Sequence, residues 1–204
     1  FQPGYGTVSS SVQDTVGLTV VQVSTIAAVY TWAFALCQFF GGALLDRLGA
    51  RKILPASIAL VAAGVFIFAN ANSFEMLLLS QVVLAIGSCT GFVGAGYIGG
   101  QWFGMAKFSF MFGLVQMIAA LTSAISQNVF EFALGQMDWR SLFNLFGGLG
   151  IGLFVLGAIF IRNPAPVVPQ ANPSGDGFFV SVIKGMTEVA KIPHVWVASI
   201  SGAF

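Results

Sequence analysis

The chain has 204 residues, of which 57% are hydrophobic and only 7% are charged. Soluble domains carry about 25% charged residues, so this chain lacks the polar side chains needed to cover a water-facing surface. The composition excludes a soluble globular domain and predicts an all-α membrane protein, with the lipid bilayer as a partner and no nucleic acid bound. The net charge of +1 says little, because in membrane proteins the placement of charges matters more than their sum.

The chain begins with a stretch that is too short and too polar to cross a membrane alone. Residues 1–20 are predicted to be the end of a first transmembrane helix and the loop that follows it. Five predominantly apolar segments come next, and a membrane span consists of about 20 such residues. We predict transmembrane helices at residues 21–45, 53–68, 76–103, 108–131 and 141–161.

The composition changes abruptly after the last of these segments. Residues 163–175 contain four prolines, and proline disrupts a helix interior, so an extended linker is predicted there. Within a connection of residues 163–194, the segment 177–192 is predicted to be an amphipathic helix that lies at the membrane surface. Residues 195–204 would start another transmembrane helix, and residues 1–162 would form an N-terminal helical half. The apolar face of the surface helix would carry Phe178, Val182, Met186 and Val189.

The basic residues indicate how these helices are oriented. Arg140 stands alone on one side of the predicted spans, and the other seven basic residues fall on the opposite side. Because cytoplasmic loops are enriched in Lys and Arg, we expect the connections after the first, third and fifth predicted spans to be cytoplasmic. The protein would be a multi-pass protein of the inner (plasma) membrane. The seven residues are Arg47, Arg51, Lys52, Lys107, Arg162, Lys184 and Lys191.

A polar stretch from Gly42 to Lys52 separates the first two predicted spans. We expect a short loop in which one glycine allows close helix approach and Gly49 allows a sharp turn. Asp46 would stand at the exit of the preceding helix, and the basic residues would anchor the next helix at the lipid headgroups. The residues that define the pattern are Gly42, Asp46, Arg47, Gly49, Arg51 and Lys52.

Written as G-x-x-x-D-R-x-G-x-R-K, this stretch resembles the signature loop of the major facilitator superfamily, which joins transmembrane helices 2 and 3. The likeness extends to Gln101-Trp102-Phe103, which is similar to organic-anion and metabolite symporter branches, and to Trp139-Arg140. The resemblance implies a partial fold of that family, from the end of helix 1 through helix 6 to the start of helix 7. It also implies alternating access between two six-helix halves, with the pattern residues acting as a conformational gate. The chain would be roughly half of such a transporter.

No ionisable side chain lies well inside the predicted spans, although such charges usually mark ion or proton pathways. The substrate path would then be lined by uncharged polar side chains that suit a small polar or zwitterionic solute. The alternative is that these side chains hydrogen-bond between helices and only stabilise their packing. The candidates are Tyr30, Gln81, Ser88, Gln116, Ser123 and Gln127.

The leading hypothesis is a secondary active transporter of a small organic solute, of the symporter type, with H+ or Na+ as the coupling ion that the hypothesis allows, and we expect a monomer. The alternatives are proton-coupled efflux of drugs or metabolites and a non-transporting sensor on the same fold. Membrane enzymes need clustered titratable groups, which this chain lacks, so we predict no enzymatic activity and no cofactor. Cys37 and Cys89 are expected to be packing residues, with neither a disulfide nor a metal site. Glycine pairs at 87 and 91 and at 148 and 152 are expected to mediate helix packing.

Overall fold

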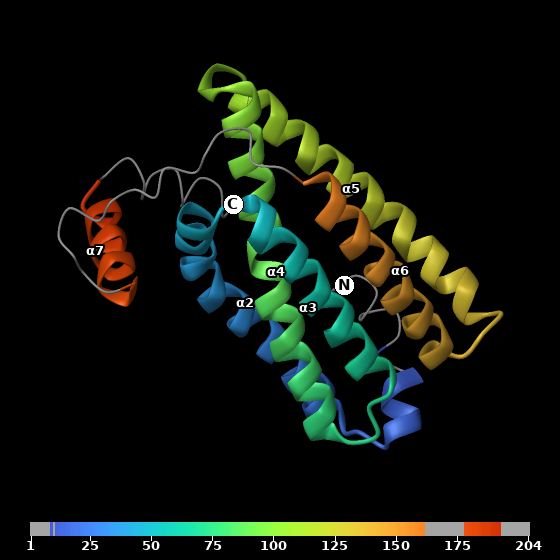
Figure 1. The fold of residues 1–204 in the computed structure, drawn as a ribbon. Coiled ribbons are helices and arrows are strands. Elements are labelled where there is room, and N and C mark those ends of the chain that lie inside the picture. Colours follow the sequence, from blue (N-terminus) through green and yellow to red (C-terminus); the bar gives the residue numbers. More distant parts are fainter. Residues whose placement is uncertain (1–8, 10, 162–177, 193–204) are drawn as a thin grey trace. The chain divides into compact units, whose positions relative to one another are not determined.

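The computed structural model describes residues 9, 11–161 and 178–192. The chain divides into two compact units, Phe1–Val167 and Val168–Phe204. All regular structure in the described residues is helical. The first unit contains five long helices, and Figure 1 shows that successive ones run in opposite directions. The expected linker after residue 162 and the expected span at residues 195–204 lie outside the described residues.

The five long helices each extend beyond the predicted spans at one or both ends, and short connections join them; the surface helix predicted at residues 177–192 is shorter, at Phe178–Ala190. A short helical stretch at residues 11–16 precedes them. The first unit contains α2 (Val20–Leu48), α3 (Ala50–Ala69), α4 (Phe74–Phe103), α5 (Met105–Leu134) and α6 (Trp139–Phe160), and the second unit contains α7 (Phe178–Ala190). Five of these helices, α2 to α6, are long and apolar enough to cross a membrane.

Polar side chains fix where several helices begin. The Thr19 hydroxyl accepts from the backbone N–H of Gln22, whose side chain accepts in return from the backbone N–H of Thr19, so α2 starts with a capping box. Ser73 caps α4 by accepting from the N–H of Met76, and Asp138 caps α6 by accepting from an N–H in its first turn. These bonds satisfy backbone donors that the first turn leaves without a helical partner.

Helix α4 lies at the centre of the first unit and contacts α2, α3 and α5, while α3 also contacts α6. The α3–α4 contact is close because Gly87 faces α3: a Cβ atom there would lie 2.8 Å from the backbone nitrogen of Val61. A hydrogen bond between the hydroxyls of Ser57 and Thr90 joins the same two helices. Small residues and interhelical hydrogen bonds of this kind drive helix association inside membranes.

The expected glycine packing is correct at only some positions. Gly91 on α4 and Gly148 and Gly152 on α6 have no described atom within 4 Å of an added Cβ, so they mediate no close packing among the described residues. Other glycines of α6 take that role and bring it against α3. The closest of these approaches are made by Gly147 to Phe66 and by Gly150 to Ala62.

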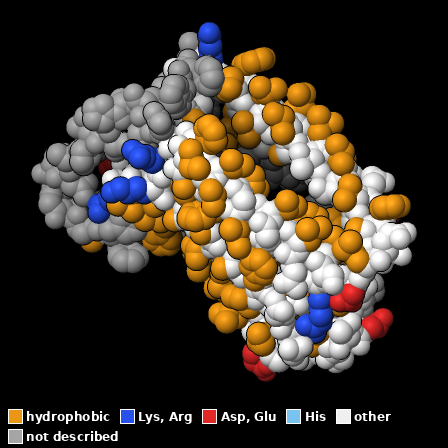
Figure 2. All heavy atoms as spheres, turned by 45° about the vertical axis from the view of Figure 1, so that its right-hand side comes forward, with side chains coloured by type: hydrophobic (Ala, Val, Ile, Leu, Met, Phe, Trp, Pro, Cys, Tyr) orange, Lys and Arg blue, Asp and Glu red, His pale blue; other side chains and the backbone are white. Residues whose placement is uncertain are grey.

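The outer surface of the first unit is apolar, as a lipid-facing surface requires. Figure 2 shows hydrophobic side chains spread over much of one face, with charged side chains gathered toward its edges. Large hydrophobic side chains remain exposed on every long helix, for example Trp32 on α2 and Phe132 on α5, which are 72% and 74% exposed.

Candidate functional site

The predicted loop between Gly42 and Lys52 is almost entirely helical. Gly49 is its one non-helical residue, because α2 continues to Leu48 and α3 begins at Ala50. Gly49 has φ 76° and ψ 157°, a conformation that only glycine adopts readily, and its N–H donates to the carbonyl of Leu45. A single glycine therefore reverses the chain direction, and the longer loop that the sequence predicts is not needed.

The pattern residues lie around this α2–α3 junction on two helices. The side chains of Asp46 and Arg47 on the last turn of α2 are exposed, as are Arg51 and Lys52 on the first turn of α3. Gly42 contacts α4, since a Cβ atom there would lie 3.9 Å from Val93. The junction therefore places one acidic and three basic side chains, all exposed, at one end of the first unit.

The α4–α5 junction repeats this geometry, which the sequence analysis did not anticipate. Gly104 has φ 72° and ψ 165°, and it is the only non-helical residue between α4 and α5. Its N–H donates to the carbonyl of Gly100, and its carbonyl accepts from the N–H of Lys107. At the α2–α3 junction the Gly49 carbonyl accepts in the same way from the N–H of Lys52. In the sequence, the feature that the two junctions share is a glycine three residues before a lysine, Gly49 before Lys52 and Gly104 before Lys107.

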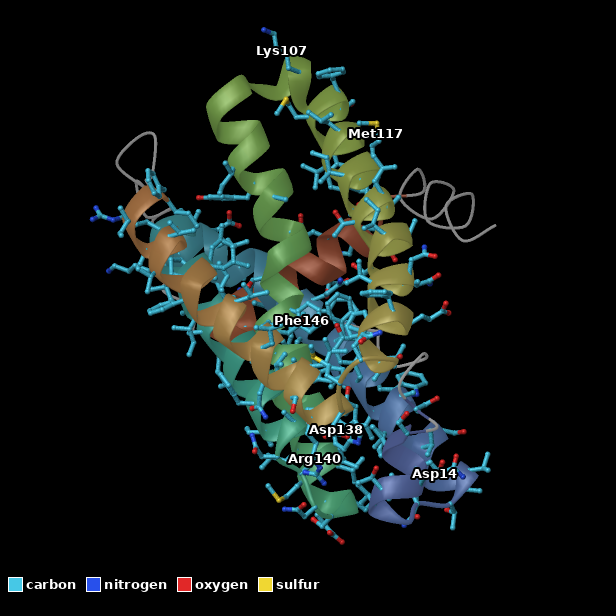
Figure 3. All side chains as sticks on the ribbon, turned by 90° about the vertical axis from the view of Figure 1, so that its right-hand side faces the viewer. Asp14, Lys107, Met117, Asp138, Arg140 and Phe146 are labelled. Atoms are coloured by element: carbon cyan, nitrogen blue, oxygen red, sulfur yellow. The ribbon has the colours of Figure 1, made fainter. Side chains whose placement is uncertain are left out.

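Charged side chains mark the two ends of the first unit. Figure 3 places Lys107 at one end and Asp14, Asp138 and Arg140 at the opposite end. Because successive helices run in opposite directions (Figure 1), the α2–α3 junction lies at the Lys107 end. We call this end, which carries Arg47, Arg51, Lys52 and Lys107, the basic end. The separation of charges toward the ends is what a bundle with an apolar middle section requires.

The opposite end is held together by Trp139 and Arg140. The Trp139 indole Nε1 donates to Thr15 Oγ1 at 3.2 Å, and its ring packs against Phe68 and Phe143. The Arg140 guanidinium donates to the Ala69 carbonyl at 3.3 Å and to Asn72 Oδ1 at 3.0 Å, and it lies 4.7 Å from the centre of the Trp139 ring. The pair therefore joins the start of α6 to the α3–α4 connection and to the residues before α2.

The candidate path residues on α2 and α4 are largely buried. Gln81 is only 2% exposed, and its amide Nε2 has no hydrogen-bond partner among the described residues. Ser88 and Tyr30 are half-buried, and the Tyr30 ring stacks on Phe34 at 5.8 Å. An unpaired buried amide donor lowers the stability of the folded protein by about 1–3 kcal/mol. A hydrogen-bond acceptor for Gln81 Nε2 is therefore expected, and none occurs among the described residues.

The candidates on α5 are more accessible. Gln116 and Gln127 are exposed and Ser123 is half-buried. Helix α5 contacts α4 near the basic end, where a Cβ atom at Gly99 would lie 3.7 Å from Met111, and it contacts α6 near the other end. Figure 3 shows α5 diverging from α4 between these places, so the two groups of candidates lie on helices that separate.

No group of three or more His, Cys, Asp or Glu side chains that could hold a metal ion occurs among the described residues. Cys37 and Cys89 are free thiols on α2 and α4. The described part of the chain therefore offers polar, uncharged side chains in its middle section and charged groups at its ends.

This architecture is that of a polytopic helical membrane protein, and the comparison with known proteins defines the family. The chain matches the Major Facilitator Superfamily over residues 4–204 and belongs to it. The predicted fold class, a partial fold of this superfamily, is confirmed. The superfamily consists of transporters and not of enzymes, in agreement with the sequence analysis.

Several curated relatives are similar to the chain at low identity. The "Probable sulfoacetate transporter SauU" of Cupriavidus necator is 25% identical over 152 residues, which are 74% of this chain and 35% of the relative. The "Probable galactarate/D-glucarate transporter GudP" of Bacillus subtilis is 26% identical over 79% of this chain and 37% of its own length. The "Quinolone resistance protein NorA" of Staphylococcus aureus is 26% identical over 72% of this chain and 38% of its own length. The chain thus spans little more than a third of these relatives.

Proposed function

We propose that this chain is the N-terminal part of a secondary transporter that moves a small organic solute across the membrane by alternating access. The observation that carries the proposal is the α2–α3 junction, where a one-residue reversal at Gly49 presents Asp46, Arg47, Arg51 and Lys52 at one exposed end of the bundle. Alternating access requires two halves that separate and close around a central site. An exposed acid–base group on a rigid helical corner can form and break contacts with the other half during that cycle.

The proposed solute is a small organic acid. Two relatives are named as transporters of sulfoacetate and of galactarate or D-glucarate, all of which are organic acids. The middle sections of α2 to α6 carry no ionisable group apart from the cysteine and tyrosine side chains. This half would therefore contribute amide and hydroxyl donors, of which the unpaired Nε2 of Gln81 is one. Tyr30, Ser88, Gln116, Ser123 and Gln127 are the other residues proposed to line the path.

We assign the basic end to the cytoplasm, because cytoplasmic loops carry the excess of Lys and Arg. Proton-coupled efflux is the second candidate function, and the similarity to the quinolone resistance protein favours it. Efflux antiporters of this superfamily usually carry a motif with glycine and proline on helix 5. Residues 114–128 of this chain contain neither glycine nor proline. Uptake of an organic acid is therefore the better-supported direction.

The Asp46→Asn substitution tests the proposed gate. We expect nearly unchanged expression and folding, because Asp46 is exposed, and a loss of uptake of at least tenfold, because the neutral amide no longer pairs with a basic partner as strongly. The measurement is uptake of radiolabelled sulfoacetate and D-glucarate into proteoliposomes that contain the full-length protein.

Asp14→Asn is the matched control, since it removes an exposed carboxylate at the opposite end, and it should transport at the normal rate. A full rate for Asp46→Asn at normal expression would refute the gate. Saturable accumulation of a quinolone, without uptake of either acid, would favour efflux. Failure of the wild-type protein to move any solute would favour the third hypothesis, a non-transporting sensor on the same fold.

A further inference from the structure

An apolar pocket of about 220 Å³ lies between α3 and α6 in the first unit. It is partly open to the surroundings, and its lining contains no charged, hydroxyl or amide side chain. We refer to it as the α3–α6 slot. The residues that line it are Ala59, Ala62, Ala63, Phe66, Ile151 and Phe154.

The slot exists because of how small and large residues alternate along the α3–α6 contact. Gly150 and Gly157 bring α6 close to α3, since Cβ atoms there would lie 3.0 Å from Ala62 and 3.3 Å from Ile58. Phe154 lies between these two glycines in the sequence, and α3 lines the slot with Ala59, Ala62 and Ala63 in addition to Phe66. Small side chains opposite a bulky one leave space that the two helices do not fill themselves.

The depth of the slot places it in the hydrocarbon region of a bilayer. Ala59 lies nine residues after Ala50, the first residue of α3, and Phe66 sixteen residues after it, which corresponds to about 14 and 24 Å along the axis. The hydrocarbon core is about 30 Å thick, so the slot opens near its middle. The neighbouring Leu60, Leu149 and Leu153 are 41%, 56% and 58% exposed, as expected of a surface that contacts lipid.

A cationic side chain lies above the slot on the same face of α3. Lys52 precedes Ala59 by seven residues, which is two helical turns, and side chains seven residues apart share a helix face. Lys52 and its neighbour Arg51 are both exposed at the basic end. Basic residues at the end of a membrane helix attract anionic headgroups. The distance from Lys52 to the slot matches the depth that an acyl chain reaches within one leaflet.

We propose that the α3–α6 slot binds one acyl chain of an anionic phospholipid whose phosphate lies at Lys52 and Arg51. The slot is smaller than the 300–1,000 Å³ typical of pockets for drug-sized ligands, and it lacks the polar groups that orient a solute. A narrow apolar slot in contact with the bilayer is filled by hydrocarbon, because water would find no hydrogen-bond partner there. The slot does not depend on which solute the protein moves or in which direction, whereas its headgroup residues Lys52 and Arg51 also belong to the proposed gate.

Photolabelling of the full-length protein tests the proposal. The protein is placed in nanodiscs that contain a phosphatidylglycerol with a diazirine near the methyl end of one acyl chain, irradiated, digested and mapped by mass spectrometry. We expect labels to concentrate on residues 59–66 and 151–154. Ala59→Leu and Ala63→Leu fill the slot and should each reduce this labelling at least threefold. Ala35→Leu adds the same bulk to an exposed position on α2 and should leave the labelling of residues 59–66 and 151–154 unchanged.

A headgroup comparison tests the second part of the proposal. Lys52→Gln should reduce labelling by the phosphatidylglycerol probe more than labelling by a zwitterionic phosphatidylcholine probe with the same acyl chain. Labels spread evenly over the exposed residues of α2 and α3 would overturn the proposal, as would unchanged labelling in both leucine variants. Cross-linked protein dimers joined through residues 59–66 would instead show that a second copy occupies the slot.

Discussion

Gly49 and Gly104 hold the backbone in a region that residues with a Cβ atom rarely enter, with φ of 76° and 72° and ψ near the extended value. Each is the single residue between two long helices. A residue with a side chain at either place costs on the order of 1–3 kcal/mol of strain, or else it forces the helices to separate. These two glycines therefore fix the angles at which α2 meets α3 and α4 meets α5.

Gly104→Ala is expected to lower the stability of the detergent-solubilised protein by about 1–3 kcal/mol, because alanine disfavours this backbone conformation. Gly113 is the control: it lies inside α5 with no described atom within 4 Å of an added Cβ, so Gly113→Ala should be neutral or stabilise the helix by up to about 1 kcal/mol. Reversible unfolding in mixed micelles measures both variants. Equal stabilities for the two would mean that the Gly104 conformation carries no strain for alanine.

At the scale of helices, the sequence predicts where each helix runs but not which face packs. Gly87 and Gly91 are four residues apart and equally plausible as packing positions, yet only Gly87 lies against α3. On α6, positions 147 and 150 contact α3, whereas 148 and 152 do not. The reason is physical: an apolar side chain is about as stable in contact with lipid as in contact with another helix. The hydrophobic periodicity that reveals the packed face of a soluble helix is therefore absent.

Gly87→Ala is expected to destabilise the protein by about 1–3 kcal/mol, because its Cβ would lie 2.8 Å from the Val61 backbone and the two helices would have to move apart. Gly91→Ala meets open space and should change stability by less than about 1 kcal/mol. Thermal inactivation of ligand-free protein in one detergent compares the pair. If Gly91→Ala is the more damaging change, a helix from outside the described residues packs there.

At the scale of the whole first unit, α5 stands apart from the other helices. No residue in the most apolar part of α5 is buried, and its described attachments are the α4 contact near the basic end and an aromatic contact with α6. In the latter, the Phe130 ring stacks on Phe146 at 5.0 Å and lies 5.9 Å from Phe143. A helix attached near its two ends can change its tilt with little loss of contact, and the proposed alternating access would use such a movement.

Phe130→Ala is expected to loosen the α6 attachment of α5 and to increase hydrogen–deuterium exchange of its amides, because losing an aromatic pair costs about 0.5–1.5 kcal/mol beyond the lost buried area. Phe132→Ala removes the same ring from a position that is 74% exposed and should leave the exchange unchanged. Exchange mass spectrometry on both variants in nanodiscs provides the comparison. Identical exchange in the two would show that other contacts hold this end of α5.

The sequence by itself determined the membrane class, the five spans, the separation of charge toward the ends and the family pattern around Gly49, because these depend on composition, length and local spacing. Tertiary structure decided that the pattern is a one-residue corner, that Gly104 forms a second such corner, and that Gln81 is buried while Gln116 and Gln127 are exposed. It also decided which glycines pack and where the α3–α6 slot opens. These features depend on how each helix is turned about its axis, which is set by contacts between residues far apart in the chain.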